Sequence, residues 1–438
     1  MGKRANIAIL GGGILGLSAA YNCLTRGLGD VTVYESDEEP GGLARTFEVC
    51  GTRLEMYHHF LCDTDRVILN QMSEFGLSEH IKWGDCRMGM FSSGRQWDFT
   101  TPLDLLRFGA LSLTSRLRFG LAMLLLQRKT DWRPLESVSA TRWLKRWTGE
   151  RAYEVVWSHL MKSKFDCFED QIPLSWLWAR TTRRAGSKRE GSALEHFGYV
   201  SGSVAILIDE YMKRIAQMGG EVQTECKVTG IERTREGEFQ IESKLGNRVH
   251  RAVISSIPLP ALLSAVDFFP DGYRTRLASI RYQTVLNMSI ILKRPFSNFF
   301  WLNIGDSAIP FPGIIEFSHL RPEFDGRSVI YLPNYLPEEH RLNSLSDEEL
   351  FDEFVEALGR ISPGFTADQI ESFHVFRHPH ADPYYTLNYS KLLPEHSTLF
   401  KRFYIYNTAQ IYPITRNVSN SILFGQDAAR LLEKDLKG

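Results

Sequence analysis

The chain has 438 residues, 43% of them hydrophobic and 24% charged, and its formal net charge at pH 7 is −1. This length is too great for one typical hydrophobic core and indicates two or three domains in an ordinary globular protein. The near-zero net charge argues against a nucleic-acid partner, and the lack of any apolar run of about 18 residues predicts that no helix spans a membrane.

The N-terminal segment has the pattern of a dinucleotide-binding turn. An apolar strand at residues 7–10 leads into a glycine turn at residues 11–16, which opens a helix, and a second strand at residues 31–34 ends at Glu35. The acid follows the turn at the offset of about 20 residues that is typical of such sites. Strand, turn, helix, strand and acid in this order predict a dinucleotide site, and the alternative is a purely structural glycine-rich turn.

Each residue type in this segment has a physical role. Gly11 allows the tight bend, Gly13 lets the backbone approach a pyrophosphate, and Gly16 lets the helix pack on the strand. The phosphates would lie on free N–H groups at the helix N-terminus, where the helix dipole favours negative charge. Glu35 would accept hydrogen bonds from a ribose, and its charge would repel a 2′-phosphate.

A second glycine turn follows at residues 41–46. Here the chain resembles the FAD-dependent oxidoreductases related to flavin amine oxidases, protoporphyrinogen oxidases and phytoene desaturases. In that family such a turn runs along the pyrophosphate and ribityl chain, so the resemblance implies FAD as the cofactor. It also implies that the last strand and helix of the chain complete the flavin site. The expected FAD contacts are Gly11, Gly13, Ile14, Leu15, Gly16, Glu35, Ser36, Gly41, Gly42, Leu43, Ala44, Arg45, Thr46, Met56, Tyr57, Val228, Asn407, Val418 and Ser419.

Two adjacent histidines, His58 and His59, follow in the segment at residues 53–60. The resemblance places this segment beside the flavin ring, where an imidazole could act as an acid, a base or a hydrogen-bond donor. The alternative is one buried structural histidine and one exposed histidine. No further His, Cys or Asp ligands are arranged with the pair, so no metal site is expected.

Residues 102–184 are expected to be largely helical, and residues 116–129 are their most apolar stretch. This stretch is bracketed by basic side chains and is too short to cross a bilayer. It is either a core helix beneath a substrate cavity or an interfacial helix that brings the enzyme to anionic lipid. The basic cluster that follows suits either an anionic or glycosyl substrate or a solvated loop edge. The solvated loop is favoured for residues 188–189, and both alternatives stay open for Arg180 and Arg183.

Two departures from the resembling family concern the substrate side. Flavin amine oxidases carry a lysine in a strand that residues 282–290 match, but this stretch contains none. Residues 381–385 instead resemble a segment of UDP-galactopyranose mutase, which implies that Tyr385 could hold a diphosphate or a sugar; aromatic packing in a turn is the alternative. Arg416 could bind an anionic substrate group. The expected catalytic residues are His58, His59, Tyr385 and Arg416.

The predicted fold is α/β with two domains. A Rossmann-like FAD-binding domain is assembled from residues 1–95, 198–265 and 395–438. The substrate domain combines a helical insertion at residues 96–197 with a strand-rich part at residues 266–394, whose sheet is mixed or antiparallel. The cofactor domain is therefore discontinuous in sequence.

Three functions are consistent with these features. The first is an FAD-dependent desaturase, dehydrogenase or oxidase that takes a hydride from a small apolar, lipid-linked or glycosyl substrate onto flavin N5. The second is a non-redox flavoenzyme similar to UDP-galactopyranose mutase, which would act on a nucleotide sugar or glycan precursor. The third is a flavin-binding scaffold without chemistry. No feature of the sequence predicts an oligomeric state.

The six cysteines are scattered without a C-x-x-C pair and are expected to be reduced thiols. The N-terminus passes directly into the first strand, which leaves no room for a signal peptide. The sequence therefore predicts a cytoplasmic enzyme, with residues 116–129 as the candidate for peripheral membrane contact.

Overall fold

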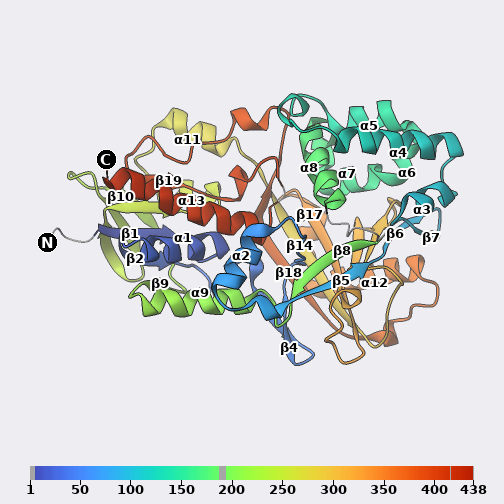
Figure 1. Cartoon of the computed structure of the whole chain (residues 1–438), viewed down its shortest axis with the longest axis horizontal. Helices are drawn as coiled ribbons and strands as arrows, with labels where there is room; N and C mark the ends of the chain where they lie inside the picture. Colours follow the sequence, from blue (N-terminus) through green and yellow to red (C-terminus); the bar gives the residue numbers. More distant parts are fainter. Residues whose placement is uncertain (1–4, 187–193, 415, 438) are drawn as a thin grey trace.

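The computed structural model describes residues 5–186, 194–414 and 416–437. Figure 1 shows a parallel sheet on the side where the termini lie and a larger sheet on the other side, with a group of helices above the larger sheet. The chain passes between the two halves several times. This arrangement confirms the predicted α/β class, with parallel and antiparallel sheets in one chain.

Five strands form the parallel sheet: β1 (Ala5–Leu10), β2 (Gly29–Tyr34), β9 (Glu221–Gln223), β13 (Ala252–Ser255) and β19 (Phe403–Ile405). Their order is β19-β13-β1-β2-β9, and every neighbouring pair is parallel. Successive side chains of a strand point to opposite faces, so Ile7 and Ile9 enter one buried cluster while Ala8 and Leu10 enter another. The apolar run at residues 7–10 is therefore buried on both faces, as parallel strands usually are.

Three helices cover one face of this sheet: α1 (Ile14–Thr25), α9 (Ala205–Gln217) and α13 (Val418–Lys437). Helix α1 lies very close to α13, because a Cβ built on Gly425 would come within 2.6 Å of the Leu15 carbonyl oxygen. The Ser18 hydroxyl also donates a hydrogen bond of 2.9 Å to the Ile422 carbonyl. Helix α1, near the N-terminus, and helix α13, at the C-terminus, thus pack tightly against each other in one layer.

The other face packs against a three-stranded antiparallel sheet and a short helix: β10 (Gly230–Arg233), β11 (Phe239–Ser243), β12 (Gly246–His250) and α10 (Leu259–Ala265). Strand β10 starts at Gly230. The preceding residues are held elsewhere, because the Cys226 N–H donates to the Glu35 carbonyl at 2.6 Å. Lys227 and Val228 consequently line a cavity rather than a sheet.

The larger sheet has seven strands: β6 (Met88–Ser92), β7 (Arg95–Asp98), β14 (Tyr282–Leu292), β15 (Trp301–Ile304), β16 (Gly313–Glu316), β17 (Ser328–Leu336) and β18 (Ile370–Pro383). Their order is β18-β14-β17-β16-β15-β6-β7, and only the β15–β6 pair is parallel. Helix α12 (Asp347–Ile361) packs on this sheet. The domain boundary predicted at residue 95 falls inside β7, because the β6–β7 hairpin joins this sheet rather than the parallel one.

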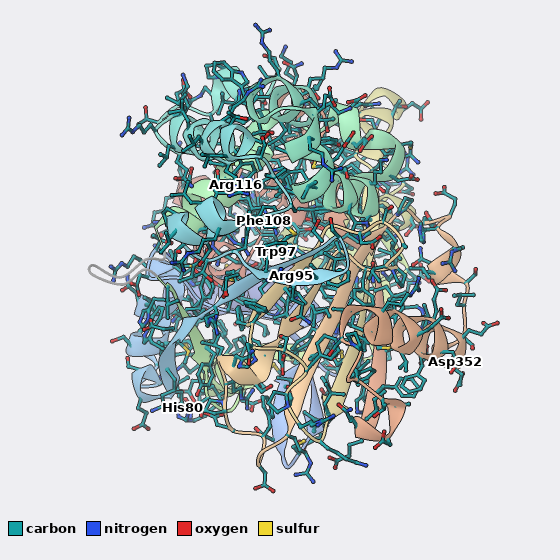
Figure 2. The ribbon with its side chains drawn as sticks, turned by 90° about the vertical axis from the view of Figure 1, so that its right-hand side faces the viewer. His80, Arg95, Trp97, Phe108, Arg116 and Asp352 are labelled. Atoms are coloured by element: carbon teal, nitrogen blue, oxygen red, sulfur yellow. The ribbon has the colours of Figure 1, made fainter. Side chains whose placement is uncertain are left out.

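The helical insertion contains α3 (Pro102–Arg107), α4 (Leu113–Gln127), α5 (Ala140–Thr148), α6 (Glu150–Val156), α7 (Ser158–Phe165) and α8 (Leu174–Ala185). Figure 2 shows Phe108, which follows α3, close to Trp97 of the β6–β7 hairpin. Their ring centroids lie 5.5 Å apart. The other elements are α2 (Arg66–Glu74), β3 (Thr46–Val49), β4 (Thr52–Glu55), β5 (Ile81–Cys86), β8 (Glu195–Val200) and α11 (Asp271–Ala278). Residues 188–189, predicted as a solvated loop, lie outside the described residues.

Helix α4 is only partly a core helix. Phe119, Ala122 and Leu126 are buried, but a stripe of leucines on the opposite face is exposed. No helix among the described residues is long and apolar enough to cross a bilayer. All six cysteines are free, in agreement with the predicted reduced thiols.

We predict that Gly425→Ala lowers the free energy of unfolding by about 1–3 kcal/mol, because the added methyl group overlaps the backbone of α1. Gly359→Ala in α12 is the matched control, since a Cβ there meets nothing within 4 Å. Removing backbone freedom at this helical site should leave stability unchanged or raise it by roughly 0.5–1 kcal/mol. Urea unfolding followed by circular dichroism measures both variants, and equal effects would contradict the close α1–α13 contact.

Candidate active site

A cavity of about 870 Å³ lies between the parallel sheet and the larger sheet. At one end its lining comes from the glycine turns, Glu35 and Val228. At the other end it comes from the larger sheet and from α7 and α8, including Trp301 and Arg180. A single space therefore contacts both halves of the fold.

The two glycine turns lie side by side at the first end. The Gly41 N–H donates to the Gly12 carbonyl at 2.8 Å. Gly11 has φ +95° and Gly42 has φ +56°, conformations that residues with a side chain rarely adopt. A Cβ on Gly13 would meet nothing nearer than 3.9 Å, so the space beside this residue belongs to the cavity.

Gly16 does not line the cavity, and its role is packing. A Cβ on Gly16 would lie 1.9 Å from the Gly11 carbonyl oxygen, which no side chain could accommodate. The first turn of α1 can therefore sit directly against the end of β1. This contact agrees with the helix–strand packing predicted for this glycine.

Glu35 is buried at the end of β2 and is held by backbone donors. Its Oε2 accepts from the Gly12 N–H at 2.6 Å, and its Oε1 accepts from the Asp37 N–H at 2.9 Å. Charge-assisted hydrogen bonds of this kind fix the carboxylate beside the first glycine turn. Its predicted bond to a ribose stays a prediction.

Most of the predicted site residues line this cavity. They are Gly11, Gly13, Ile14, Leu15, Glu35, Ser36, Gly41, Gly42, Leu43, Ala44, Arg45, Tyr57, His58, His59, Val228, Tyr385, Arg416 and Val418. Those outside the lining are Gly16, Thr46, Met56, Asn407 and Ser419. Asn407 is fully engaged in the protein, because its Oδ1 accepts from the Ala409 N–H and its Nδ2 donates to the Ile257 carbonyl.

Helix α13 begins at the cavity wall. Asn417 caps it, since its Oδ1 accepts from the Asn420 N–H at 2.7 Å. Val418 and Ser421 in the first turn line the cavity, and the helix dipole favours negative charge there. The predicted arrangement of a helix N-terminus facing the cofactor is compatible with this position.

His58 and His59 are half-buried in the cavity wall. Burial, together with the charges of nearby arginines, lowers the pKa of His58 to about 3 and that of His59 to about 4. Both imidazoles are therefore neutral at pH 7. The His59 Nδ1 lies 2.6 Å from the Tyr57 carbonyl oxygen, which can only accept, so Nδ1 carries the proton and Nε2 is an acceptor.

A buried ion cluster from three parts of the chain borders the same space. Lys164 of α7 donates to the Asp382 carboxylate at 2.9 Å, and the Arg416 guanidinium lies 4.0 Å from it. The Lys164 ammonium also lies 3.5 Å from the centre of the Tyr335 ring. Two cations thus share one carboxylate beside an aromatic wall.

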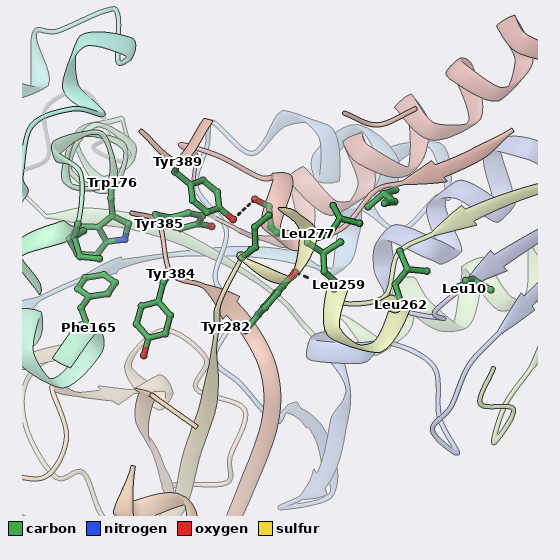
Figure 3. Close-up of a cluster of buried hydrophobic side chains, with 14 of the residues drawn as sticks. Leu10, Phe165, Trp176, Leu259, Leu262, Leu277, Tyr282, Tyr384, Tyr385 and Tyr389 are labelled. Carbon is green, nitrogen blue, oxygen red and sulfur yellow. Dashed lines mark hydrogen bonds between the residues drawn. The ribbon is translucent and has the colours of Figure 1, made fainter. Parts of the chain in front are cut away.

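Tyr385 is fixed by packing. Its ring lies next to that of Tyr389 (Figure 3), with the centroids 5.2 Å apart. Its hydroxyl donates to the Ile411 carbonyl at 3.3 Å. Burial raises the pKa of this phenol well above its ordinary value, so the hydroxyl stays protonated. The tyrosines of this turn therefore pack in the core, and Tyr385 also contacts the cavity.

Several residues of the site were not predicted from the sequence, among them Lys164, Trp301 and Tyr335. Lys164 follows buried Met161 at helical spacing, which places a lysine on an otherwise apolar face. That signal was available, although it is weak. Trp301 and Tyr335 lie on strands whose apolar patterns did not distinguish the cavity face from the core.

A family model described as flavin containing amine oxidoreductase matches residues 15–404. The chain belongs to this family. The predicted recognition is confirmed, and the chain is an FAD-dependent oxidoreductase of the family. No curated protein sequence matches the chain.

Solved structures of other proteins share the fold at low sequence identity. A protein from Exiguobacterium sp. 255-15, provisionally described as a protoporphyrinogen oxidase, is 16% identical over 100% of both chains, with a TM-score of 0.78. Reduced UDP-galactopyranose mutase is 16% identical over 98% of this chain and 96% of its own, with a TM-score of 0.77. Cyclohexylamine oxidase from Brevibacterium oxydans IH-35A is 13% identical over 99% and 100%, with a TM-score of 0.71.

The residues at the first end of the cavity fit FAD, the cofactor of this flavin-containing family. The open space beside Gly13 and the N-terminus of α1 suit a pyrophosphate. Glu35 and Val228 also line the cavity, and their predicted contacts with the cofactor stay predictions. Met56 and Thr46 do not line the cavity, and their predicted contacts with FAD stay predictions.

We predict that Gly13→Val loses most of its FAD while remaining folded, because the new side chain enters the open space without touching protein atoms first. Gly272→Val is the matched control, as a Cβ at this position also meets nothing within 4 Å and the residue lies outside the cavity. Flavin content per protein and circular dichroism measure the two effects. Full flavin content in Gly13→Val would contradict a pyrophosphate at this turn.

Proposed function

We propose that this chain takes a hydride from a small-molecule substrate onto flavin N5, as an oxidase, dehydrogenase or desaturase. The supporting observation is that one cavity joins the two glycine turns to buried polar side chains contributed by the larger sheet and α7. Bound flavin supplies the hydride acceptor, and the protein supplies position and proton transfer.

The protein groups suited to proton transfer are His58 and His59. Both are neutral, and the Nε2 of His59 is free to accept because Nδ1 is engaged by the Tyr57 carbonyl. The Lys164–Asp382 pair beside them is held by burial and by Arg416. We infer that the histidines take the substrate proton and that the ion cluster orients a polar part of the substrate.

A second candidate is a non-redox reaction on a nucleotide sugar or glycan precursor. The observation that favours it is charge, because the described residues that line the cavity include eight Lys and Arg and three Asp and Glu, although the whole chain is nearly neutral. Such a lining suits a diphosphate. The fold that the chain shares with UDP-galactopyranose mutase is compatible with this alternative.

Anaerobic mixing of the oxidised holoprotein with a substrate is expected to bleach the visible absorbance of the flavin. His59→Gln should slow this bleaching by about 100-fold or more, because it removes the proposed proton acceptor. His80→Gln is the control, since His80 lies outside the cavity. Turnover of a nucleotide sugar only after pre-reduction, without net oxidation, would instead support the second candidate. Flavin that dithionite cannot reduce would indicate a scaffold.

We also propose that the helical insertion docks on an anionic lipid bilayer. Among the described residues thirteen large hydrophobic side chains are exposed, and seven of them are leucines of residues 103–125. On α4 they follow helical spacing and form one stripe, so the side of the helix that faces away from the core is apolar. The stripe and its neighbours on α3 are Leu103, Leu106, Leu113, Leu117, Leu121, Leu124 and Leu125.

The charges around this stripe favour lipid over a second copy of the chain. Residues 103–129 contain five basic side chains and one acid, Asp104, which caps α3. No ion pair with any of the five occurs in the part of the chain that the structure describes. Two copies packed through this surface would bring like charges together, whereas anionic headgroups would neutralise them.

We predict that the triple variant Leu117→Gln, Leu121→Gln, Leu124→Gln no longer co-floats with vesicles that contain phosphatidylglycerol, whereas the wild type does. Its stability should be almost unchanged, because these side chains are exposed in the folded chain. Leu399→Gln is the matched control, a leucine 64% exposed outside this region. Equal flotation of triple variant and wild type, or no flotation of the wild type, would contradict the proposal.

A further inference from the structure

Helix α8 brings three arginines to the cavity wall. Arg180, Arg183 and Arg184 are three and four residues apart, so they lie on neighbouring positions of one helix face. Arg183 has a counter-ion, since it donates to the Asp65 carboxylate at 2.9 Å and stacks over Phe60. The positive charge of Arg183 is therefore neutralised by the Asp65 carboxylate.

Arg180 is different. Its guanidinium lies between two aromatic rings, 5.9 Å from the centre of Trp176 and 5.9 Å from that of Trp301. In the part of the chain that the structure describes, no carboxylate forms a salt bridge with it and no carbonyl accepts from it, although the Glu195 carboxylate is near enough to raise its pKa. Burial, together with the charge of Arg184, lowers the pKa of Arg180 to about 10, so the group is cationic at pH 7. A half-buried cation that forms no salt bridge with the described residues is costly unless a ligand supplies the anion.

The other charges of the cavity do not satisfy Arg180. Glu35 and Asp37 belong to the cofactor end, and Asp382 is already shared by Lys164 and Arg416. The FAD pyrophosphate is predicted to lie at the glycine turns, beside Gly13. Positive charge therefore remains in excess where the substrate would bind.

We propose that Arg180, with Trp301 as the adjoining wall, binds a carboxylate or phosphate group of the substrate. The inference deepens the function proposed above, because the ligand is the substrate of the same cavity. The substrate is therefore proposed to carry a negative charge. A cationic amine, which the family description would suggest, would be repelled at this end by Arg180 and its neighbours.

The position of Trp301 supports this assignment. Its ring contacts the His58 ring at 5.4 Å and lies 5.2 Å from the Arg184 guanidinium. A group held by Arg180 would therefore lie beside the histidines assigned to proton transfer. Binding at Arg180 would also fix the distance between the reacting carbon and the flavin end.

Calorimetric titration of the FAD-saturated protein at constant ionic strength tests the proposal without turnover. The probes are inorganic phosphate, benzoate, benzamide and benzylamine, which separate phosphate from carboxylate and anion from neutral and cationic analogues. We expect phosphate or benzoate to bind, and benzamide and benzylamine to bind at least about tenfold more weakly. Saturation with FAD keeps the probes from the pyrophosphate position.

Arg180→Gln should weaken binding of the anionic probe by about tenfold or more, and Arg180→Lys should retain part of it. Arg281→Gln is the matched control, because Arg281 also stacks on a ring, that of Phe168, but lies outside the cavity. The melting temperature of Arg180→Gln should equal or exceed that of the wild type, because the substitution removes a half-buried charge that forms no salt bridge with the described residues.

Equal anion binding by wild type and Arg180→Gln would overturn the proposal, as would tighter binding of benzylamine than of benzoate. A large loss of thermal stability in Arg180→Gln would also overturn it, because it would show a structural role. These results do not depend on flavin reduction. Absence of hydride transfer with intact anion binding would contradict the proposed function and leave the subsite standing.

Discussion

The hydrogen bond from the Gly41 N–H to the Gly12 carbonyl joins the two glycine turns, and the cofactor end of the cavity depends on it. The two turns can approach each other this closely because their glycines lack side chains. The contact aligns the N-terminus of α1 with the segment that leads to His58 and His59. A turn of ordinary residues at either place would separate the cofactor turns and close the space beside Gly13.

The second organising feature is the separation of charge within the cavity. Carboxylates belong mainly to the cofactor end, where Glu35 is held by backbone donors. Cations gather at the far end, on α7, α8 and the last loop before α13. Because charges interact strongly in a low-dielectric space, the excess of cations at this end favours ligands that carry a negative charge.

The helical insertion connects this cationic end to the outer surface of the molecule. Gln127 of α4 donates to the Thr181 carbonyl of α8 at 3.4 Å, and Trp178 donates to the Lys129 carbonyl at 2.8 Å. The exposed leucine stripe of α4 is therefore one helix away from Arg180. Docking of α4 on a bilayer would place the substrate end of the cavity close to the lipid surface, which suits an amphiphilic anion.

The local pattern of the sequence was sufficient for the cofactor but not for the substrate end. The function predicted for the turns at residues 11–16 and 41–46 depends on their backbone conformation and on the absence of side chains. Both properties are set by consecutive residues, so they can be recognised in the sequence. The sequence by itself thus determined the α/β class, the FAD family and the position of Glu35. The tertiary structure alone decided that Lys164, Asp382 and Arg416 share one cluster, that Arg180 forms no salt bridge with the described residues and that the α4 leucines face outward. The physical reason is that charge pairing and burial depend on residues far apart in sequence, and no local periodicity encodes them.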